Sequence, residues 1–282
     1  MKRFLFVLLS CVICLPCYAD EIEKKTELKI GLLPYVSATR LIKTFVPLKT
    51  YIESQTEYDV IFLTAPTFKK FVERTTAREY DLVFTAPHFA LLAEQADKYK
   101  RMARFTRELS ACVFVAADSK AKFLVDLKNK TISTPHSLAI VSVLGESMMR
   151  EAGLNLNSEV AFLRTPSHNN VMLSVANHGS EAGVVAAGIF EQFTAKRRNK
   201  DKFRLLSCSE PVPAAMFIAN PKMPANESAK LAKVLLDFPL SLEGRRFFSS
   251  TPFRGMESIN DADMLGVEKY IKDLKVLLRT SD

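Results

Sequence analysis

Short apolar stretches alternate with longer segments of helical spacing along most of this chain of 282 residues. Residues 28–32 are predicted as a strand, and Pro47 is predicted to open a helix with Leu48, Tyr51 and Ile52 on one face. Further strands are expected at 60–63, 82–84, 131–133, 160–163 and 183–186, each followed by a helical pattern. Strands that alternate with helices in this way indicate parallel βαβ units and an α/β fold.

Two extended stretches break the alternation. Residues 111–117 and 203–208 are not followed at once by a helix, and the second continues through Pro211 and Pro213 into another extended run. Chain segments that cross between two lobes have this pattern. We therefore predict a two-lobed fold with a ligand cleft between lobes joined by two crossing strands. Lobe 1 is predicted at 20–108 plus 215–282 and lobe 2 at 109–214, with residues 226–278 mainly helical.

The first nineteen residues have the features of a cleaved signal peptide. Lys2 and Arg3 precede an apolar run at 4–13, and small residues occupy the positions before a cleavage point after Ala19. This predicts a periplasmic protein. An alternative is a lipoprotein signal, in which Cys11 becomes lipidated. The later chain contains no apolar run long enough to span a bilayer.

Cys112 and Cys208 are the two cysteines that follow the predicted leader. An even pair in an oxidising compartment predicts a disulfide, and both residues lie on the segments that we expect to cross between the lobes. The alternative is two buried thiols.

Composition and motifs argue against several functional classes. The net charge of +8 favours an anionic ligand, but the basic run at 196–200 has no interleaved aromatic residues, so nucleic acid is not an expected partner. The chain has only nine glycines and no phosphate loop, nucleophile elbow or zinc-protease motif. We therefore expect no enzyme activity and no cofactor, and we expect a monomer.

Four loops at strand-to-helix junctions carry the candidate site. They place hydroxyl, imidazole and amide groups beside helix N-termini, whose free N–H groups favour an anion. The candidate ligand-binding residues are Tyr35, Ser37, Thr85, His88, Ser137, His168, Asn169 and Asn170. Each Ser, Thr or Asn taken singly is also an ordinary helix cap. The histidines His88, His136 and His168 leave a metal site as a further alternative.

At these motifs the chain resembles the phosphate/phosphite/phosphonate-type substrate-binding proteins of ABC transporters, which have the type II periplasmic-binding fold. The resemblance covers roughly residues 28 to 255. It rests on the opening strand and loop at 28–34, the Pro-Leu-x-x-Tyr helix at 45–52, the segment 80–87 and the Ser-His loop at 167–170. The resemblance implies a ligand-binding role for His168.

The chain departs from that family pattern at four places. The family's Ser-Thr-Ser-Gly loop is replaced by residues 136–139. A tyrosine that often precedes the second helix is replaced by Phe68, and His88 stands at an aromatic position. An acidic residue expected after 183–185 is replaced by Ala186 and Ala187. In phosphonate binders that acid suits a cationic amino group on the ligand, so these departures leave phosphonate itself in doubt.

The expected function is an extracytoplasmic solute-binding protein that captures a small oxyanion for an ABC transporter permease. Hinge motion would close the lobes on the ligand. The alternatives are a periplasmic sensing module that signals to a membrane receptor kinase, and an enzyme built on the same scaffold. A metal-binding protein that uses the three histidines is a fourth possibility.

Overall fold

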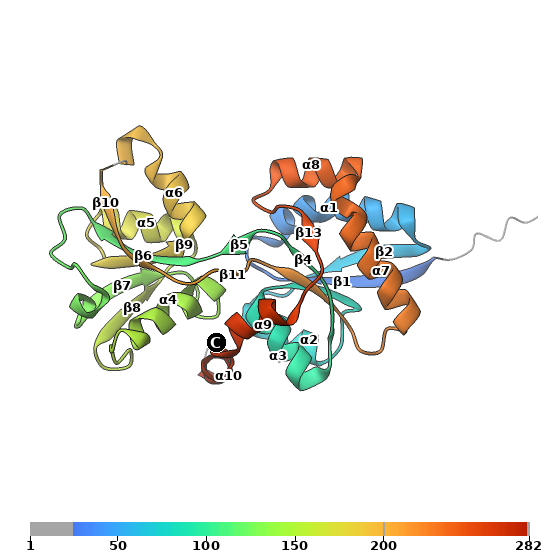
Figure 1. Cartoon of the computed structure of the whole chain (residues 1–282), viewed down its shortest axis with the longest axis horizontal. Helices are drawn as coiled ribbons and strands as arrows, with labels where there is room; N and C mark the ends of the chain where they lie inside the picture. Colours follow the sequence, from blue (N-terminus) through green and yellow to red (C-terminus); the bar gives the residue numbers. More distant parts are fainter. Residues whose placement is uncertain (1–24, 200, 281–282) are drawn as a thin grey trace, which may run out of the picture.

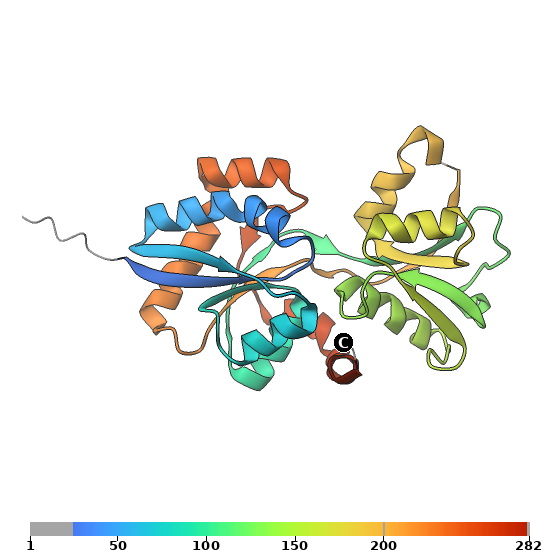
Figure 2. The ribbon, with the colours of Figure 1, turned by 180° about the vertical axis from the view of Figure 1, so that it is seen from behind.

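A computed structural model of the chain describes residues 25–199 and 201–280. Two lobes, each built around its own sheet, lie side by side and are linked by the short strands β5 (Glu108–Leu109) and β11 (Val212–Pro213) (Figures 1 and 2). The expected α/β fold with two lobes is confirmed. The predicted signal peptide and the alternative lipid site at Cys11 lie outside the described residues.

The larger sheet has six strands in the order β13-β4-β12-β3-β1-β2. Its strands are β1 (Thr26–Leu32), β2 (Tyr58–Leu63), β3 (Leu82–Thr85), β4 (Lys100–Phe105), β12 (Met216–Ala219) and β13 (Met256–Glu257). Strands β2, β1 and β3 run parallel, and β12 is antiparallel to both β3 and β4. The carboxyl ends of the three parallel strands therefore meet at one edge, and the polar loops follow there.

Helices cover both faces of this sheet, with α1 and α8 on one side and α2 and α3 on the other (Figure 1). Their bounds are α1 (Ala38–Gln55), α2 (Phe68–Thr76), α3 (Pro87–Asp97), α7 (Ala225–Asp237) and α8 (Leu242–Ser250). The prediction that Pro47 opens a helix is wrong, because α1 begins nine residues earlier and contains Pro47. Burial of Leu41 and Phe45 extends the apolar face before the proline and offsets its cost of about 3 kcal/mol.

The smaller sheet has five strands in the order β10-β6-β9-β7-β8. Its elements are β6 (Ala111–Ala116), η1 (Leu124–Leu127), β7 (Lys130–Thr134), α4 (Ile140–Glu151), β8 (Val160–Arg164), α5 (His168–Ala176), β9 (Ala182–Ala186), α6 (Ala187–Thr194), η2 (Arg197–Asn199) and β10 (Phe203–Cys208). Strands β9, β7 and β8 are parallel neighbours, so their carboxyl ends also share one edge.

The segments that join the lobes differ from those expected. Strands β6 and β10 lie wholly in the smaller sheet, so the prediction that 111–117 and 203–208 cross between the lobes is wrong. The crossing is made beside them by β5 (Glu108–Leu109) and β11 (Val212–Pro213), which pair with each other. Six consecutive buried residues in β6 explain the difference, because such a strand belongs inside a sheet.

The C-terminal region returns to the larger lobe. After α7 and α8 come η3 (Phe238–Leu240, between those helices), β13, α9 (Asp261–Glu268) and α10 (Ile271–Thr280). The expectation of a mainly helical segment missed β13, a two-residue strand that pairs with β4. None of the helices in the described part of the chain combines the length and apolarity needed to cross a membrane.

Candidate functional site

Tyr35 and Ser37 lie in the loop after β1, at the carboxyl edge of the larger sheet. The ring of Tyr35 packs near Phe84 and Phe253 and remains 39% exposed. Burial of the hydroxyl raises the Tyr35 pKa to about 12, so it stays a neutral donor at physiological pH. Ser37 is the exposed N-cap residue of α1, and its side chain makes no cap hydrogen bond. Both side chains can therefore turn toward a ligand.

His88 joins the two lobes. It lies in the first turn of α3, is fully buried, and its Nε2 lies 3.0 Å from the carbonyl oxygen of Leu138 in the other lobe. Nε2 must carry the proton to donate to that carbonyl, and Nδ1 has no partner among the described residues. Burial lowers the His88 pKa to about 4, so the ring is neutral. In this arrangement His88 holds the lobes together and is not exposed to a ligand.

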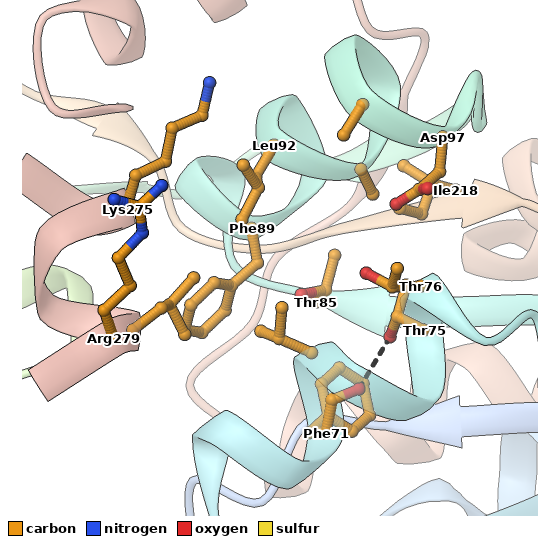
Figure 3. Close-up of a pocket in the computed structure, with 14 residues that line it drawn as sticks. Phe71, Thr75, Thr76, Thr85, Phe89, Leu92, Asp97, Ile218, Lys275 and Arg279 are labelled. Carbon is orange, nitrogen blue, oxygen red and sulfur yellow. Dashed lines mark hydrogen bonds between the residues drawn. The ribbon is translucent and has the colours of Figure 1, made fainter. Parts of the chain in front are cut away.

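Thr85 lies elsewhere. It ends β3, and its buried hydroxyl has no partner among residues 25–199 and 201–280. Figure 3 shows Thr85 in a pocket between α2, α3 and α10, with Phe89 beside it. Strand alternation explains this position, because neighbouring side chains of a strand point to opposite faces of the sheet.

The loop between β7 and α4 faces the larger lobe. His136 packs against Phe68 of that lobe, with ring centroids 5.2 Å apart. Its Nδ1 accepts the backbone N–H of Leu138, which leaves Nε2 as the protonated nitrogen and a donor for a ligand. Burial lowers the pKa of His136, with a smaller contribution from Arg164. Ser137 is half-buried in the same loop.

The next loop, between β8 and α5, carries His168, Asn169 and Asn170. His168 is the first residue of α5, and its buried Nδ1 finds no partner in the described chain. Burial lowers the pKa of His168. Asn169 is exposed, whereas the Asn170 side-chain oxygen accepts from the Ser167 hydroxyl, and Ser167 Oγ caps the helix by accepting the backbone N–H of Asn170. Of these three residues, His168 has the free buried polar atom.

Ser133 adds a second buried polar atom at the same edge. It lies in β7, next to β8 and β9, and its hydroxyl is also without a partner in the described structure. The first residue of the following loop, Thr165, donates its backbone N–H to the carbonyl of Thr134, so the two loops are in contact. Buried polar groups usually have a hydrogen-bond partner, so Ser133 Oγ and His168 Nδ1 are candidate contacts for a ligand.

Arg107 is a candidate that the sequence analysis missed. It lies between β4 and β5, where the chain leaves the larger lobe, and its Nη1 donates to the Pro252 carbonyl at 2.7 Å. Its Nη2 approaches Gly188 at the start of α6 so closely that a Cβ there would lie 2.3 Å away. No motif could have identified Arg107, because its position follows from the packing of two segments far apart in sequence.

Arg164 and Glu146 form a second charged group near the loops. Arg164 donates to Glu146 at 2.7 Å and to the Thr134 hydroxyl at 2.6 Å. Burial raises the pKa of Glu146, and Arg164 opposes that rise. This pair holds the end of β8 against α4, and Glu146 neutralises most of the Arg164 charge that could otherwise attract an anionic ligand.

The three loop histidines do not assemble a metal centre in the structure. Within the described residues, no group of three or more His, Cys, Asp or Glu side chains could hold a metal ion. His88 and His136 already use one ring nitrogen each in contacts with Leu138.

Cys112 and Cys208 form a disulfide, with Cα atoms 4.1 Å apart. The two residues are register partners on the antiparallel strands β6 and β10. The bond therefore closes the end of the smaller sheet that lies nearest to the crossing strands, rather than tying the crossing strands themselves.

Solved structures share this fold at low sequence identity. A Xanthomonas citri protein bound to ATP matches with a TM-score of 0.75 and 17% identity, over 91% of this chain and 100% of that chain. A binding protein component of an ABC phosphonate transporter from Pseudomonas aeruginosa matches with a TM-score of 0.72 and 14% identity, over 92% and 90%. A Prochlorococcus marinus protein in complex with methylphosphonate gives 0.73 and 16%, over 89% and 99%.

The family model for ABC transporter phosphonate periplasmic substrate-binding proteins matches residues 30–264. That range includes both sheets except the first residues of β1, together with the crossing strands and every candidate loop. The predicted resemblance and the role of a solute-binding protein are confirmed, and members of such a family are substrate carriers outside the cytoplasm rather than enzymes. The chain belongs to the phosphonate-type periplasmic substrate-binding protein family of ABC transporters.

Proposed function

We propose that this protein binds a small oxyanion between its lobes and delivers it to the permease of an ABC transporter. The observation that carries the proposal is the pair of unpartnered buried atoms, Ser133 Oγ and His168 Nδ1, at the shared carboxyl edge of β7 and β8. A tetrahedral anion can accept several hydrogen bonds at once and would satisfy donors of this kind.

The chemistry of the surrounding groups supports an anion. The helices α4, α5 and α6 begin at this edge, and their first N–H groups add partial positive charge. His136 Nε2–H and the hydroxyl groups of Tyr35, Ser37 and Ser137 are further donors. The guanidinium of Arg107 lies against the start of α6, where the family pattern has an acid and this chain has Ala186 and Ala187. This replacement favours a ligand without a cationic amino group.

Closure of the lobes would assemble the complete site. Contacts between the lobes already form at His88 with Leu138 and at Phe68 with His136. The two short crossing strands are the only covalent route between the sheets in the described chain, so rotation about them would separate or join the two loop sets. We place the hinge there, with lobe boundaries near residues 108 and 214.

Calorimetry with phosphate, phosphite, methylphosphonate and sulfate tests the proposal directly. His168→Ala should weaken binding of the best anion about ten- to a hundredfold, because a hydrogen bond to a charged group contributes about 1.5–3 kcal/mol. His178→Asn is the matched control, since His178 is exposed at the far end of α5 and has a φ of 54° that asparagine tolerates. An unchanged dissociation constant for His168→Ala would exclude His168 from the site.

The pH dependence of sulfate binding tests the charge of the ligand. Burial lowers the pKa of His168 in the unliganded protein, and a bound anion would raise it by favouring the imidazolium. Sulfate keeps its charge from pH 8 to 5.5, so its affinity should increase as the pH falls through this range. His168→Ala should flatten the dependence. Tighter binding at pH 8, or selective binding of a divalent cation, would contradict the oxyanion assignment.

A further inference from the structure

A cavity of about 620 Å³ lies within the larger lobe, away from the loops that meet the other lobe. Its floor is formed by Thr85 of β3 and Ile218 of β12, and its walls come from α2, α3 and α10 (Figure 3). Phe71, Phe89 and Leu92 give it a mainly apolar surface. This volume is within the range of small-molecule sites in proteins, roughly 300–1,000 Å³.

Polar groups stand at two sides of this cavity. Lys275 and Arg279 extend from α10 at one side, and both are exposed and form no ion pair with a described residue. Asp97 and Thr76 line the opposite side. Thr85 lies between Phe89 and the threonines of α2; the residue is 1% exposed, and its buried hydroxyl has no partner in the described chain. An unsatisfied hydroxyl in an apolar cavity is unfavourable unless something binds it.

From this arrangement we propose a second ligand site, for an amphipathic ligand with an anionic group at one end and a hydroxyl group at the other. Its anionic group would lie against Lys275 and Arg279, its apolar body against Phe89 and Leu92, and a hydroxyl group near Thr85 and Asp97. Charge complementarity determines the orientation of the ligand in the cavity, because Asp97 would repel an anionic group placed beside it. Desolvation of the apolar body supplies the main attraction.

The second site is independent of the proposed oxyanion site. His88 and Phe89 are neighbours in α3, but the buried imidazole of His88 contacts Leu138 while the ring of Phe89 lines the cavity. A small tetrahedral anion would leave most of the apolar wall uncovered. The two sites would therefore bind ligands of different chemistry, and binding at one site can be measured while the other site is saturated.

Calorimetry with 10-hydroxydecanoate, in the presence of excess sulfate, is the direct test. Decanoate lacks the hydroxyl group and should bind about threefold more weakly, since one neutral hydrogen bond contributes modestly. Decane-1,10-diol lacks the charge and should also bind more weakly. Thr85→Val keeps the shape of the side chain and should remove the preference for 10-hydroxydecanoate over decanoate. Equal affinity for all three compounds, or no binding of any, would overturn the proposal.

Two surface variants locate the site. Ala96→Phe places a ring at an exposed lining position and should abolish binding of 10-hydroxydecanoate. Lys275→Glu combined with Arg279→Glu should weaken binding about tenfold, since exposed charges each contribute little. Lys272→Glu is the matched control, because Lys272 is exposed on the same helix and does not line the cavity. Unchanged binding in Ala96→Phe would show that the probe binds elsewhere and would refute the site.

Discussion

The two lobes stabilise sheets of similar design by different means. The larger lobe packs a group of phenylalanine rings around Phe84, whose centroid lies 4.7–6.0 Å from those of Phe45, Phe105, Phe217 and Phe253. The smaller lobe has one comparable ring, Phe114, which contacts Phe190 and Phe203. It adds the disulfide between β6 and β10.

The lobe with less aromatic packing is also the lobe that contains the unpartnered buried polar atoms. The smaller lobe contributes two of the four candidate loops and both unpartnered atoms of the proposed oxyanion site, and one face of its sheet covers only a small separate core. The other face shares a continuous apolar core with the larger lobe. A lobe with less aromatic packing gains most from a covalent link. We infer that the disulfide offsets the smaller extent of aromatic packing in this lobe.

The largest expected effect tests the aromatic core. Phe84→Ala should lower the free energy of unfolding by about 3–5 kcal/mol, because it leaves a cavity among four rings. Phe114→Ala is the matched change in the smaller lobe and should cost less, since Phe114 contacts fewer rings. Urea unfolding followed by circular dichroism measures both. An equal or larger loss for Phe114→Ala would contradict the comparison.

Removal of the disulfide tests the other half of the comparison. The double variant Cys112→Ala and Cys208→Ala should lose about 2–4 kcal/mol, because the bond closes a loop of 96 residues in the unfolded chain. The loss should be local to the smaller lobe. Hydrogen exchange should rise in β6, β9 and β10 and stay the same in β1 and β3. A uniform rise across both sheets would show that the bond supports the whole molecule.

The buried histidine at the junction predicts a dependence of stability on pH. His88 has a pKa of about 4 in the folded protein and an ordinary value near 6.5 when unfolded, so the unfolded chain binds more protons between these values. The free energy of unfolding should therefore fall as the pH drops from about 6.5 to 4, by about 2–3 kcal/mol from His88 alone. His88→Gln can keep the bond to Leu138 without titrating and should reduce this loss. An identical pH profile in the variant would contradict the assignment.

The smallest expected effect concerns ion pairs between the lobes. Arg150 of α4 pairs with Asp273 of α10, and Glu151 pairs with Lys269 at 2.9 Å. Exposed pairs of this kind contribute about 0.2–1 kcal/mol each. Asp273→Asn should therefore weaken anion binding by a few-fold at most, and high salt should remove the difference from the wild-type protein. A large effect that persists in high salt would indicate that α10 supports closure by packing rather than by charge.

Local patterns in the sequence determined the order of the elements. The runs at 28–32, 82–84 and 183–186 could be assigned as strands because each is a short, mainly apolar stretch followed by a helical pattern, and β3 is buried throughout. The polar loops after them followed from the same reasoning, since parallel strands bring their carboxyl ends to one edge. The family could be identified as well, because its motifs keep their order along the chain.

Tertiary packing decided what those loops do. Pro47 lies inside α1 because burial of an apolar face outweighs a local helix breaker. Thr85 lines the cavity under α10, and His88 bonds to Leu138 across the junction, although both belong to the same loop in sequence. Arg107 reaches Gly188 through a contact that no local pattern encodes. The sequence by itself determined which residue types stand at the edges of the sheets. Only the folded chain decided where each side chain points, because that depends on contacts between segments far apart in sequence.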